Sequence, residues 1–157
     1  MPFIFLFLFR PFKILRNYKF FFWLYLKFLH KLFNIFNKFD AGNGWLVSIN
    51  PFGGVGELRV LFGNGVNSIN AQRGSNLNDD QWHYIAIVFD YGDNIIVYID
   101  GAQVGASIPN TLTGTISNPT KIFGISTDNA INGIIDNVRI YNRALTAQEI
   151  QQHYNNR

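Results

Sequence analysis

The residues that could do chemistry are few, and the spacing of the carboxylates argues against a catalytic pair. The only glutamates are Glu57 and Glu149. Hydrolysis of a glycosidic bond usually requires two carboxylates flanking it, roughly 5–10 Å apart. Glu57 stands alone in an expected strand and Glu149 belongs to an expected helix cap. We therefore expect a protein that is not an enzyme.

The other reactive side chains do not supply a catalytic group or a metal centre either. The histidines, His30, His83 and His153, lie far apart in sequence, and there is no cysteine for disulfide, thiol or zinc chemistry. His83 alternates with Ile85 and Ile87, as a side chain on one face of a strand would. We expect a structural role for His83, because no nucleophile or second ligand accompanies it.

Short alternating segments with Gly, Asn and Asp between them predict the scaffold that must position any site. We expect strands within 18–27, 45–49, 57–62, 66–71, 80–90, 94–100 and 132–145, and a loop over 36–45. The Asp100-Gly101 pair between two such runs is a strong hairpin signal. No helical period interleaves the strands, so the pattern predicts an all-β, antiparallel two-sheet sandwich.

One short helix is expected at the C-terminus. Thr146 and Glu149 have the spacing of a capping box, in which each side chain accepts from the other residue's backbone N–H. Ile150 and Tyr154 share a face of this helix. A helix this short is marginal alone, so we expect these two side chains to pack against the sandwich.

Charge divides the chain into two parts. Residues 1–39 carry seven basic and no acidic groups, whereas residues 40–157 carry six basic and ten acidic groups. The basic residues of the second part are scattered rather than gathered on one face, so we expect no nucleic-acid partner.

Residues 1–17 form a hydrophobic and basic segment that we leave unassigned. Basic residues interrupt every window long enough to span a membrane, and no clear secretory signal is present. One interpretation is peripheral membrane contact, with aromatic rings among the headgroups and Lys/Arg against anionic lipid. The other is that the segment replaces opening strands of the sandwich.

Three motifs in order carry a family resemblance. They are Asp80-Gln-Trp-His before a strand, Tyr98-Ile-Asp-Gly101, and Gly133-Ile-Ile-Asp-Asn-Val-Arg-Ile-Tyr-Asn-Arg-Ala-Leu145 before the helix cap. The chain from residue 18 to 157 resembles the laminin-G-like, concanavalin A-like lectin and glucanase domains. The resemblance implies a jelly-roll β-sandwich.

The resemblance also implies a non-catalytic binding module, extracellular or at the cell surface, that recognises a glycan or a protein partner. A structural or adhesive interaction domain without a small ligand is the alternative. Sugar recognition uses aromatic rings beside amides and carboxylates, and turns are where such sheets expose them. The candidate ligand-binding residues are Trp45, Tyr91, Asn94, Asp128, Asn129 and Asn132.

Asp136 is the candidate metal ligand. By strict alternation it shares a face with Ile134, Val138 and Ile140, where a carboxylate needs a hydrogen bond or a cation. The matching Asp in resembling domains often binds a structural Ca²⁺ with backbone oxygens of the opening strands. Calcium takes six to eight oxygens. Both a structural Ca²⁺ and a hydrogen-bonded Asp136 remain open.

Overall fold

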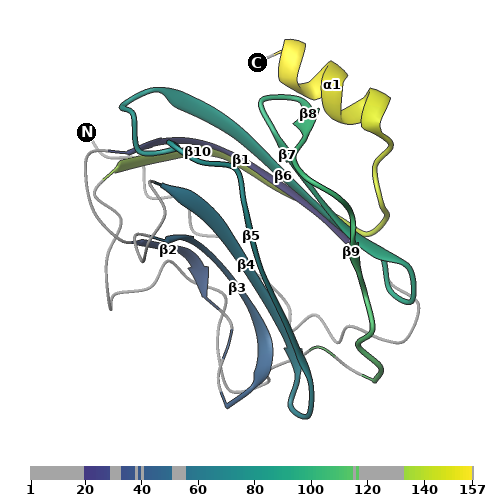
Figure 1. Cartoon of the computed structure of the whole chain (residues 1–157). Coiled ribbons are helices and arrows are strands. Elements are labelled where there is room, and N and C mark those ends of the chain that lie inside the picture. Colours follow the sequence, from purple (N-terminus) through teal and green to yellow (C-terminus); the bar gives the residue numbers. More distant parts are fainter. Residues whose placement is uncertain are drawn as a thin grey trace, which may run out of the picture.

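Two antiparallel sheets and one helix make up the described part of the chain. The structure is a computed structural model that describes residues 20–28, 33–37, 39, 41–50, 56–114, 116 and 133–156. The sheets lie face to face, and the helix lies outside one of them (Figure 1). The expected all-β sandwich with a short C-terminal helix is confirmed. Residues 1–17 lie outside the described residues, so their assignment stays a prediction.

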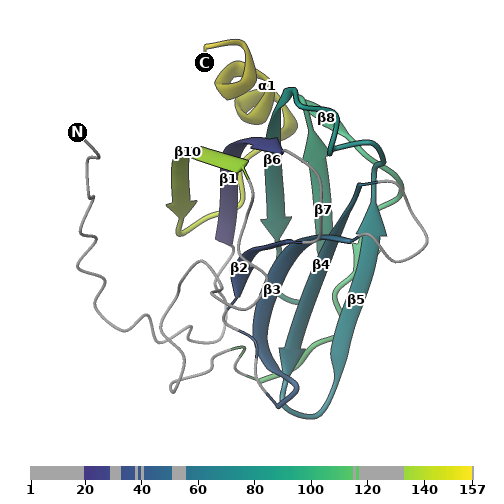
Figure 2. The same ribbon diagram turned by 90° about the vertical axis from the view of Figure 1, so that its left-hand side faces the viewer.

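The six-stranded sheet, called sheet A, holds the central hairpin of the chain. Its order is β10-β1-β6-β7-β8, and β9 pairs with β7. In that order the bounds are Gly133–Tyr141, Phe20–Phe28, Trp82–Phe89, Asn94–Ile99 and Ala102–Gln103, with β9 at Ile108–Pro109. Strand β10 lies at one side of the sheet, next to β1 (Figure 2). The expected strand within 18–27 is therefore an inner strand of sheet A.

The second sheet, sheet B, has the order β2-β3-β4-β5. These strands are Phe33–Asn37, Asn43–Asn50, Glu57–Asn64 and Ser68–Arg73. The expected loop over 36–45 is too long, because β2 and the start of β3 occupy its two ends. The hairpin of β2 and β3 has an irregular register between Asn34 and Phe36, which a strict alternation pattern does not reveal.

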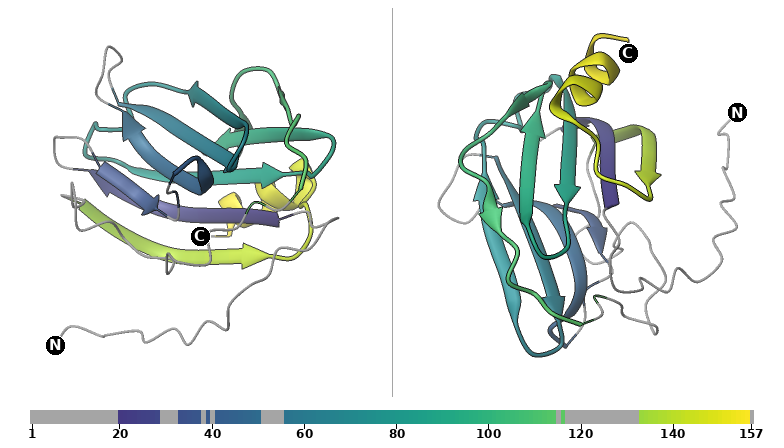
Figure 3. Two further views of the ribbon diagram at one scale, coloured as in Figure 1. Left: turned by 90° about the horizontal axis from the view of Figure 1, so that it is seen from below. Right: turned by 90° about the vertical axis from the view of Figure 1, so that its right-hand side faces the viewer.

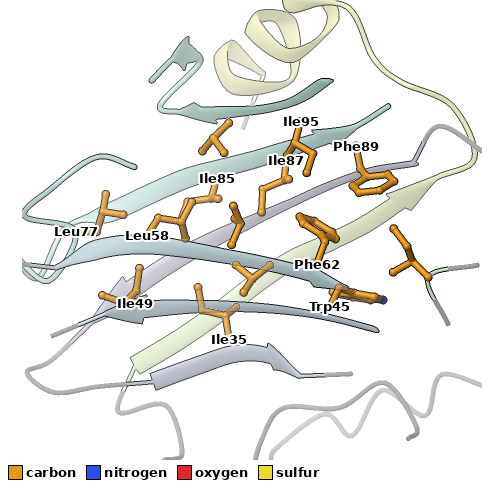
Figure 4. Packing of buried hydrophobic residues seen from close by; sticks show 14 of the residues in the cluster. Ile35, Trp45, Ile49, Leu58, Phe62, Leu77, Ile85, Ile87, Phe89 and Ile95 are labelled. Carbon is orange, nitrogen blue, oxygen red and sulfur yellow. The ribbon is translucent and has the colours of Figure 1, made fainter. Parts of the chain in front are cut away.

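The main core fills the space between the two sheets (Figure 4). In β4, every second residue from Leu58 to Phe62 is buried, as the alternation of side chains along a strand requires. These meet inward-facing side chains of sheet A such as Ile85 and Ile87. Each fully buried aliphatic side chain contributes about 1.5–3 kcal/mol relative to an exposed one.

The expected Asp100-Gly101 turn is present between β7 and β8. Both residues have positive φ, 51° and 80°, which the tight hairpin turn requires and Asp-Gly adopts readily. Gly101 is also needed for packing, because a Cβ there would lie 2.9 Å from the side chains of Gln151 and Tyr154 on the helix. The hairpin turn and the helix therefore approach each other closely.

Helix α1, Ala147–Asn155, packs on the outer face of sheet A (Figure 3). The capping box between Thr146 and Glu149 is present, as expected. Ile150 is fully buried and Tyr154 packs against the same cluster, which includes Tyr84 of β6. This outer cluster is separate from the core between the sheets, so the helix covers a second apolar surface.

The outer cluster gives a first test. We expect Ile150→Ala to lower the free energy of unfolding by about 2–5 kcal/mol, because the side chain is fully enclosed. Gln152→Ala, on the exposed side of the same helix, should change it by less than about 0.5 kcal/mol. Urea unfolding of both variants measures the difference. Equal midpoints for the two would contradict the packing of α1.

Candidate functional site

Four turn-bearing segments meet at one end of the sandwich, and we call them the turn platform. They are residues 41–42, 64–67, 90–94 and 110–114, which connect or follow strands of both sheets. The turn between β4 and β5 lies at the bottom of Figure 1. The segments come from distant parts of the chain, so only tertiary contacts can hold them together.

Hydrogen bonds join these segments in a continuous series. The N–H of Gly65 donates to the carbonyl of Gly42 at 3.0 Å. Asn64 Nδ2 donates to the carbonyl of Thr113 at 2.7 Å, and the hydroxyl of Tyr91 donates to the carbonyl of Gly114. Side chains thus bind the main chain of neighbouring turns, which fixes how the segments of the platform lie relative to one another.

Asn110 forms hydrogen bonds with the main chain of the turn between β6 and β7. It is buried, with 6% of its surface exposed. Its Nδ2 donates to the carbonyl of Asp90 at 2.8 Å, its Oδ1 accepts from the N–H of Leu112 at 3.2 Å, and its own N–H donates to the carbonyl of Asp93 at 2.9 Å. A buried amide with these partners is satisfied and orders the main chain around it.

Two of the expected ligand-binding residues lie on this platform. Tyr91 is half-buried beside Phe89, with ring centroids 6.5 Å apart, and its hydroxyl is bound to Gly114. Asn94 is half-buried at the start of β7 and donates to the carboxylate of Asp93 at 2.5 Å. The structure therefore brings together Tyr91 and Asn94 and adds the exposed Asp93 between them.

Trp45 does not belong to the surface, so its expected role as a sugar platform is wrong. Only 6% of its surface is exposed, and it packs into the core between the sheets (Figure 4). Trp45 lies opposite Phe62 in the ladder of β3 and β4. It belongs to a strand that begins at Asn43, two residues earlier than expected, and its face of that strand points inward.

Three further candidates, Asp128, Asn129 and Asn132, lie outside the described residues, so their roles stay predictions. Two residues that order the platform were missed from the sequence, Asn64 and Asn110. The only local signal for Asn64 is its place in Gly63-Asn64-Gly65, which marks a turn. Nothing near Asn110 indicates that it is buried, because its partners Asp90 and Asp93 lie about twenty residues earlier.

The described platform carries negative charge. Asp90 and Asp93 lie on it, and its described segments hold no Lys or Arg. The glutamates lie elsewhere: Glu57 begins β4, and Glu149 receives two hydrogen bonds from Arg143, at 2.6 and 3.0 Å. This Arg143 pairing and the N–H of Thr146 hold the pKa of Glu149 well below its ordinary value. Glu149 is therefore engaged as an anion in the helix cap.

His83 lies near the opposite end of β6 and binds two carboxylates. Its Nδ1 lies 2.8 Å from Asp100 Oδ2, and its Nε2 lies 3.0 Å from Asp79 Oδ1. The hydrogen bond to Asp100 is the largest cause of a raised pKa of His83, and burial opposes it in part. Asp100 Oδ1 also accepts from the N–H of Tyr84. His83 thus links the turn after β7 to the loop before β6, which supports the expected structural role.

Residues 16–151 match the family model described as the concanavalin A-like lectin/glucanases superfamily. The chain belongs to this superfamily. Comparison with curated proteins by sequence gives no match.

Solved structures with the same superfamily fold include two toxin binding domains. The binding domain of botulinum neurotoxin DC, in complex with rat synaptotagmin II, has a TM-score of 0.70 and 18% identity, over 89% of this chain and 36% of that chain. The binding domain of Paraclostridial mosquitocidal protein 1 has a TM-score of 0.72 and 18% identity, over 88% and 37%. A third structure is the botulinum neurotoxin DC binding domain in complex with SialylT, at 0.67 and 16%, over 89% and 36%. This chain spans little more than a third of each, and the likeness shows the fold.

Asp136, the candidate calcium ligand, lies in β10. Asp136 is exposed and accepts from the N–H of Asn137 at 2.7 Å. A bulge in β10, with Asn137 at a φ of 58°, places Ile135 and Val138 together on the core face. Asp136 therefore shares its face with Ile134 as expected, but the expected places of Val138 and Ile140 on that face are wrong. No cluster of three or more His, Asp or Glu suited to a metal occurs among the described residues. Calcium at Asp136 stays a prediction from the resemblance.

The described residues include no helix with the length and apolar character needed to cross a membrane. Peripheral membrane contact was expected for residues 1–17, which lie outside the residues that the structure describes, so this contact stays a prediction.

The buried amide of the platform can be tested by stability. We expect Asn110→Ala to lower the free energy of unfolding by about 2–4 kcal/mol, because two buried main-chain groups lose its amide. Asn67→Ala, in the exposed turn between β4 and β5, should stay within about 0.5 kcal/mol of wild type. Urea unfolding measures both. A small effect at Asn110 would show that the platform does not depend on this side chain.

His83 gives a pH-dependent expectation. Its pKa is raised in the folded protein, so the folded state binds more protons than the unfolded state between the ordinary value of 6.5 and the raised one. The stabilisation is complete below pH 6.5 and is lost as pH rises through the raised pKa. Urea unfolding across pH 5.5–9 should show this loss.

Asp100→Asn is the matched variant, because the amide can keep the bond to Tyr84 N–H and tolerates the positive φ but removes the charge. We expect NMR titration of the variant to show a lower pKa of His83, and its stability to depend less on pH. Asp80→Asn removes a nearby carboxylate that is not among the bonding partners of His83. An unchanged titration of His83 in Asp100→Asn would contradict the pairing.

Proposed function

We propose that this chain is a non-catalytic binding module that recognises a glycan through the turn platform. The observation that carries the proposal is that four separate segments are held in one preformed surface. Asn64, Tyr91 and Asn110 join three of them, and the main-chain bond from Gly65 to Gly42 joins the fourth. A surface ordered in advance loses less conformational entropy when a ligand binds, which favours affinity.

The chemistry of the platform suits sugar hydroxyls. Asp93 offers an exposed carboxylate beside the amide of Asn94. The half-buried ring of Tyr91 adds an aromatic surface, and there is open space at Gly92 and Gly114, where a Cβ would meet nothing within 4 Å. Carboxylates accept hydrogen bonds from hydroxyls, and amides both accept and donate them.

The charge of the platform indicates which glycans it takes. Asp90 and Asp93 would repel the carboxylate of a sialic acid, and no described platform residue is basic. We therefore place neutral glycans ahead of sialylated ones. This separates the chain from the related fold solved with SialylT, which has 16% identity to it.

The binding domains among the similar structures support a module without catalysis. The proposed glycan recognition would place it outside the cell or at its surface. A protein-interaction domain without a small ligand is the second candidate. The similar binding domain of botulinum neurotoxin DC, solved in complex with rat synaptotagmin II, favours it.

A glycan array probed with the full chain tests the proposal. We expect binding to neutral glycans and weaker or no binding to their sialylated forms. Asp93→Ala and Asn94→Ala should each weaken binding by about tenfold, the equivalent of one lost hydrogen bond of about 1.4 kcal/mol. Gln152→Ala on α1, far from the platform, should leave binding unchanged.

Two outcomes would overturn the proposal. One is a folded chain that binds no glycan on the array. The other is binding that both Asp93→Ala and Asn94→Ala leave intact, which would move the site away from the platform. Circular dichroism of each variant shows whether it is folded.

A further inference from the structure

Strand β10 lies at the edge of sheet A, and no other described strand pairs with its outer side (Figure 2). It is nine residues long, and its apolar residues Ile134 and Ile140 are 57% and 40% exposed. An edge strand presents unpaired main-chain donors and acceptors that can pair with another strand. Long, partly apolar edges of this kind are sites of association.

The bulge at Asn137 sets which side chains share a face of this edge. In the ladder with β1, Asp136 lies opposite Tyr25 and Arg139 lies opposite Trp23. Positions 25 and 23 of β1 are two residues apart, so the β10 residues opposite them, Asp136 and Arg139, point to the same face. Without the extra residue, Asp136 and Arg139 would point to opposite faces, because they are three positions apart.

Asp136 and Arg139 are both exposed and carry opposite charges on the outward face. Burial raises the pKa of Tyr84, and the charge of Arg139 opposes that rise. Tyr84 belongs to the outer cluster, so this effect agrees with the position of Arg139 on the outward face. Along the strand, the anion Asp136 and the cation Arg139 are therefore placed symmetrically about the point between Asn137 and Val138.

That arrangement is self-complementary. A two-fold axis through this point would pair β10 with β10 of a second copy, antiparallel. Asp136 of each copy would lie opposite Arg139 of the other. Ile134 would lie opposite Tyr141 on the same face, and Ile135 opposite Ile140 on the core face. A symmetric dimer requires this reciprocity, in which residue i meets j and j meets i.

We propose that the edge of β10 is a dimerisation surface for a second copy of this chain, with the register set by reciprocal Asp136–Arg139 pairs. The two copies would join their sheets into one continuous sheet through main-chain hydrogen bonds. The charge pairs select the register, and the exposed isoleucines add apolar burial.

Charge reversal provides the test, with the full chain in analytical ultracentrifugation. We expect a concentration-dependent dimer in the wild type. Asp136→Lys and Arg139→Glu should each be monomeric at concentrations where the wild type is a dimer, because each places like charges opposite each other. The double variant Asp136→Lys/Arg139→Glu restores opposite charges and should dimerise again.

A mixture of the two single variants gives a sharper result. When one copy carries Arg139→Glu and the other carries Asp136→Lys, the native Asp136 of the first faces the native Arg139 of the second. The introduced glutamate then faces the introduced lysine, so both pairs across the interface are opposite in sign. We expect a heterodimer from two monomeric samples. Nonspecific aggregation would not show this exchange.

A wild-type chain that is monomeric at several hundred micromolar would overturn the proposal, including the case in which another part of the same chain pairs with β10. A dimer that forms equally well in both single variants would also overturn it and place the interface elsewhere. Because the turn platform contains neither Asp136 nor Arg139, glycan binding can fail or succeed independently of these results.

Discussion

Packing of the two sheets through their inner faces is the interaction on which the other features depend. Alternate residues of β4 and β6 supply this layer, and Phe62 and Phe89 meet across it with ring centroids 4.7 Å apart. With no cysteine in the chain, apolar burial must offset the conformational entropy of ordering it without help from disulfides. The aromatic contacts continue from Phe89 to Tyr91, so the same core supports the turn platform from beneath.

The platform shows why polar burial is tolerated at the end of such a core. A buried amide costs free energy unless it is hydrogen-bonded, and Asn110 is bonded at its side-chain nitrogen, its side-chain oxygen and its main-chain N–H. Turns between strands would otherwise be mobile, since they have few apolar contacts of their own. The core fixes where the turns begin, and Asn64, Tyr91 and Asn110 fix how they lie relative to one another.

Local signals in the sequence predicted the elements whose causes are local. The Asp100-Gly101 turn and the Thr146–Glu149 capping box each depend on a few adjacent residues, and both are present. The expected surface role of Trp45 was wrong because its burial depends on Phe62 and other core residues, which lie seventeen or more residues away in the sequence. Val138 and Ile140 were expected on the face of Asp136 and lie on the other face, because one bulge residue, Asn137, breaks the alternation, and Asn at positive φ gives only a weak signal.

The positions of the platform and of β10 constrain what a dimer could do. The platform lies at the ends of strands, whereas the proposed dimer forms along the side of sheet A. A two-fold axis normal to the sheet reverses the strand direction, so the two platforms would point to opposite ends of the joined sheet. Such a dimer could not place both platforms on one flat surface, and it would gain little avidity there. It would instead suit the bridging of two glycan-bearing surfaces. Because the bulge at Asn137 puts Asp136 and Arg139 on one face and so sets the register of the dimer, it would also determine the directions in which the two platforms point.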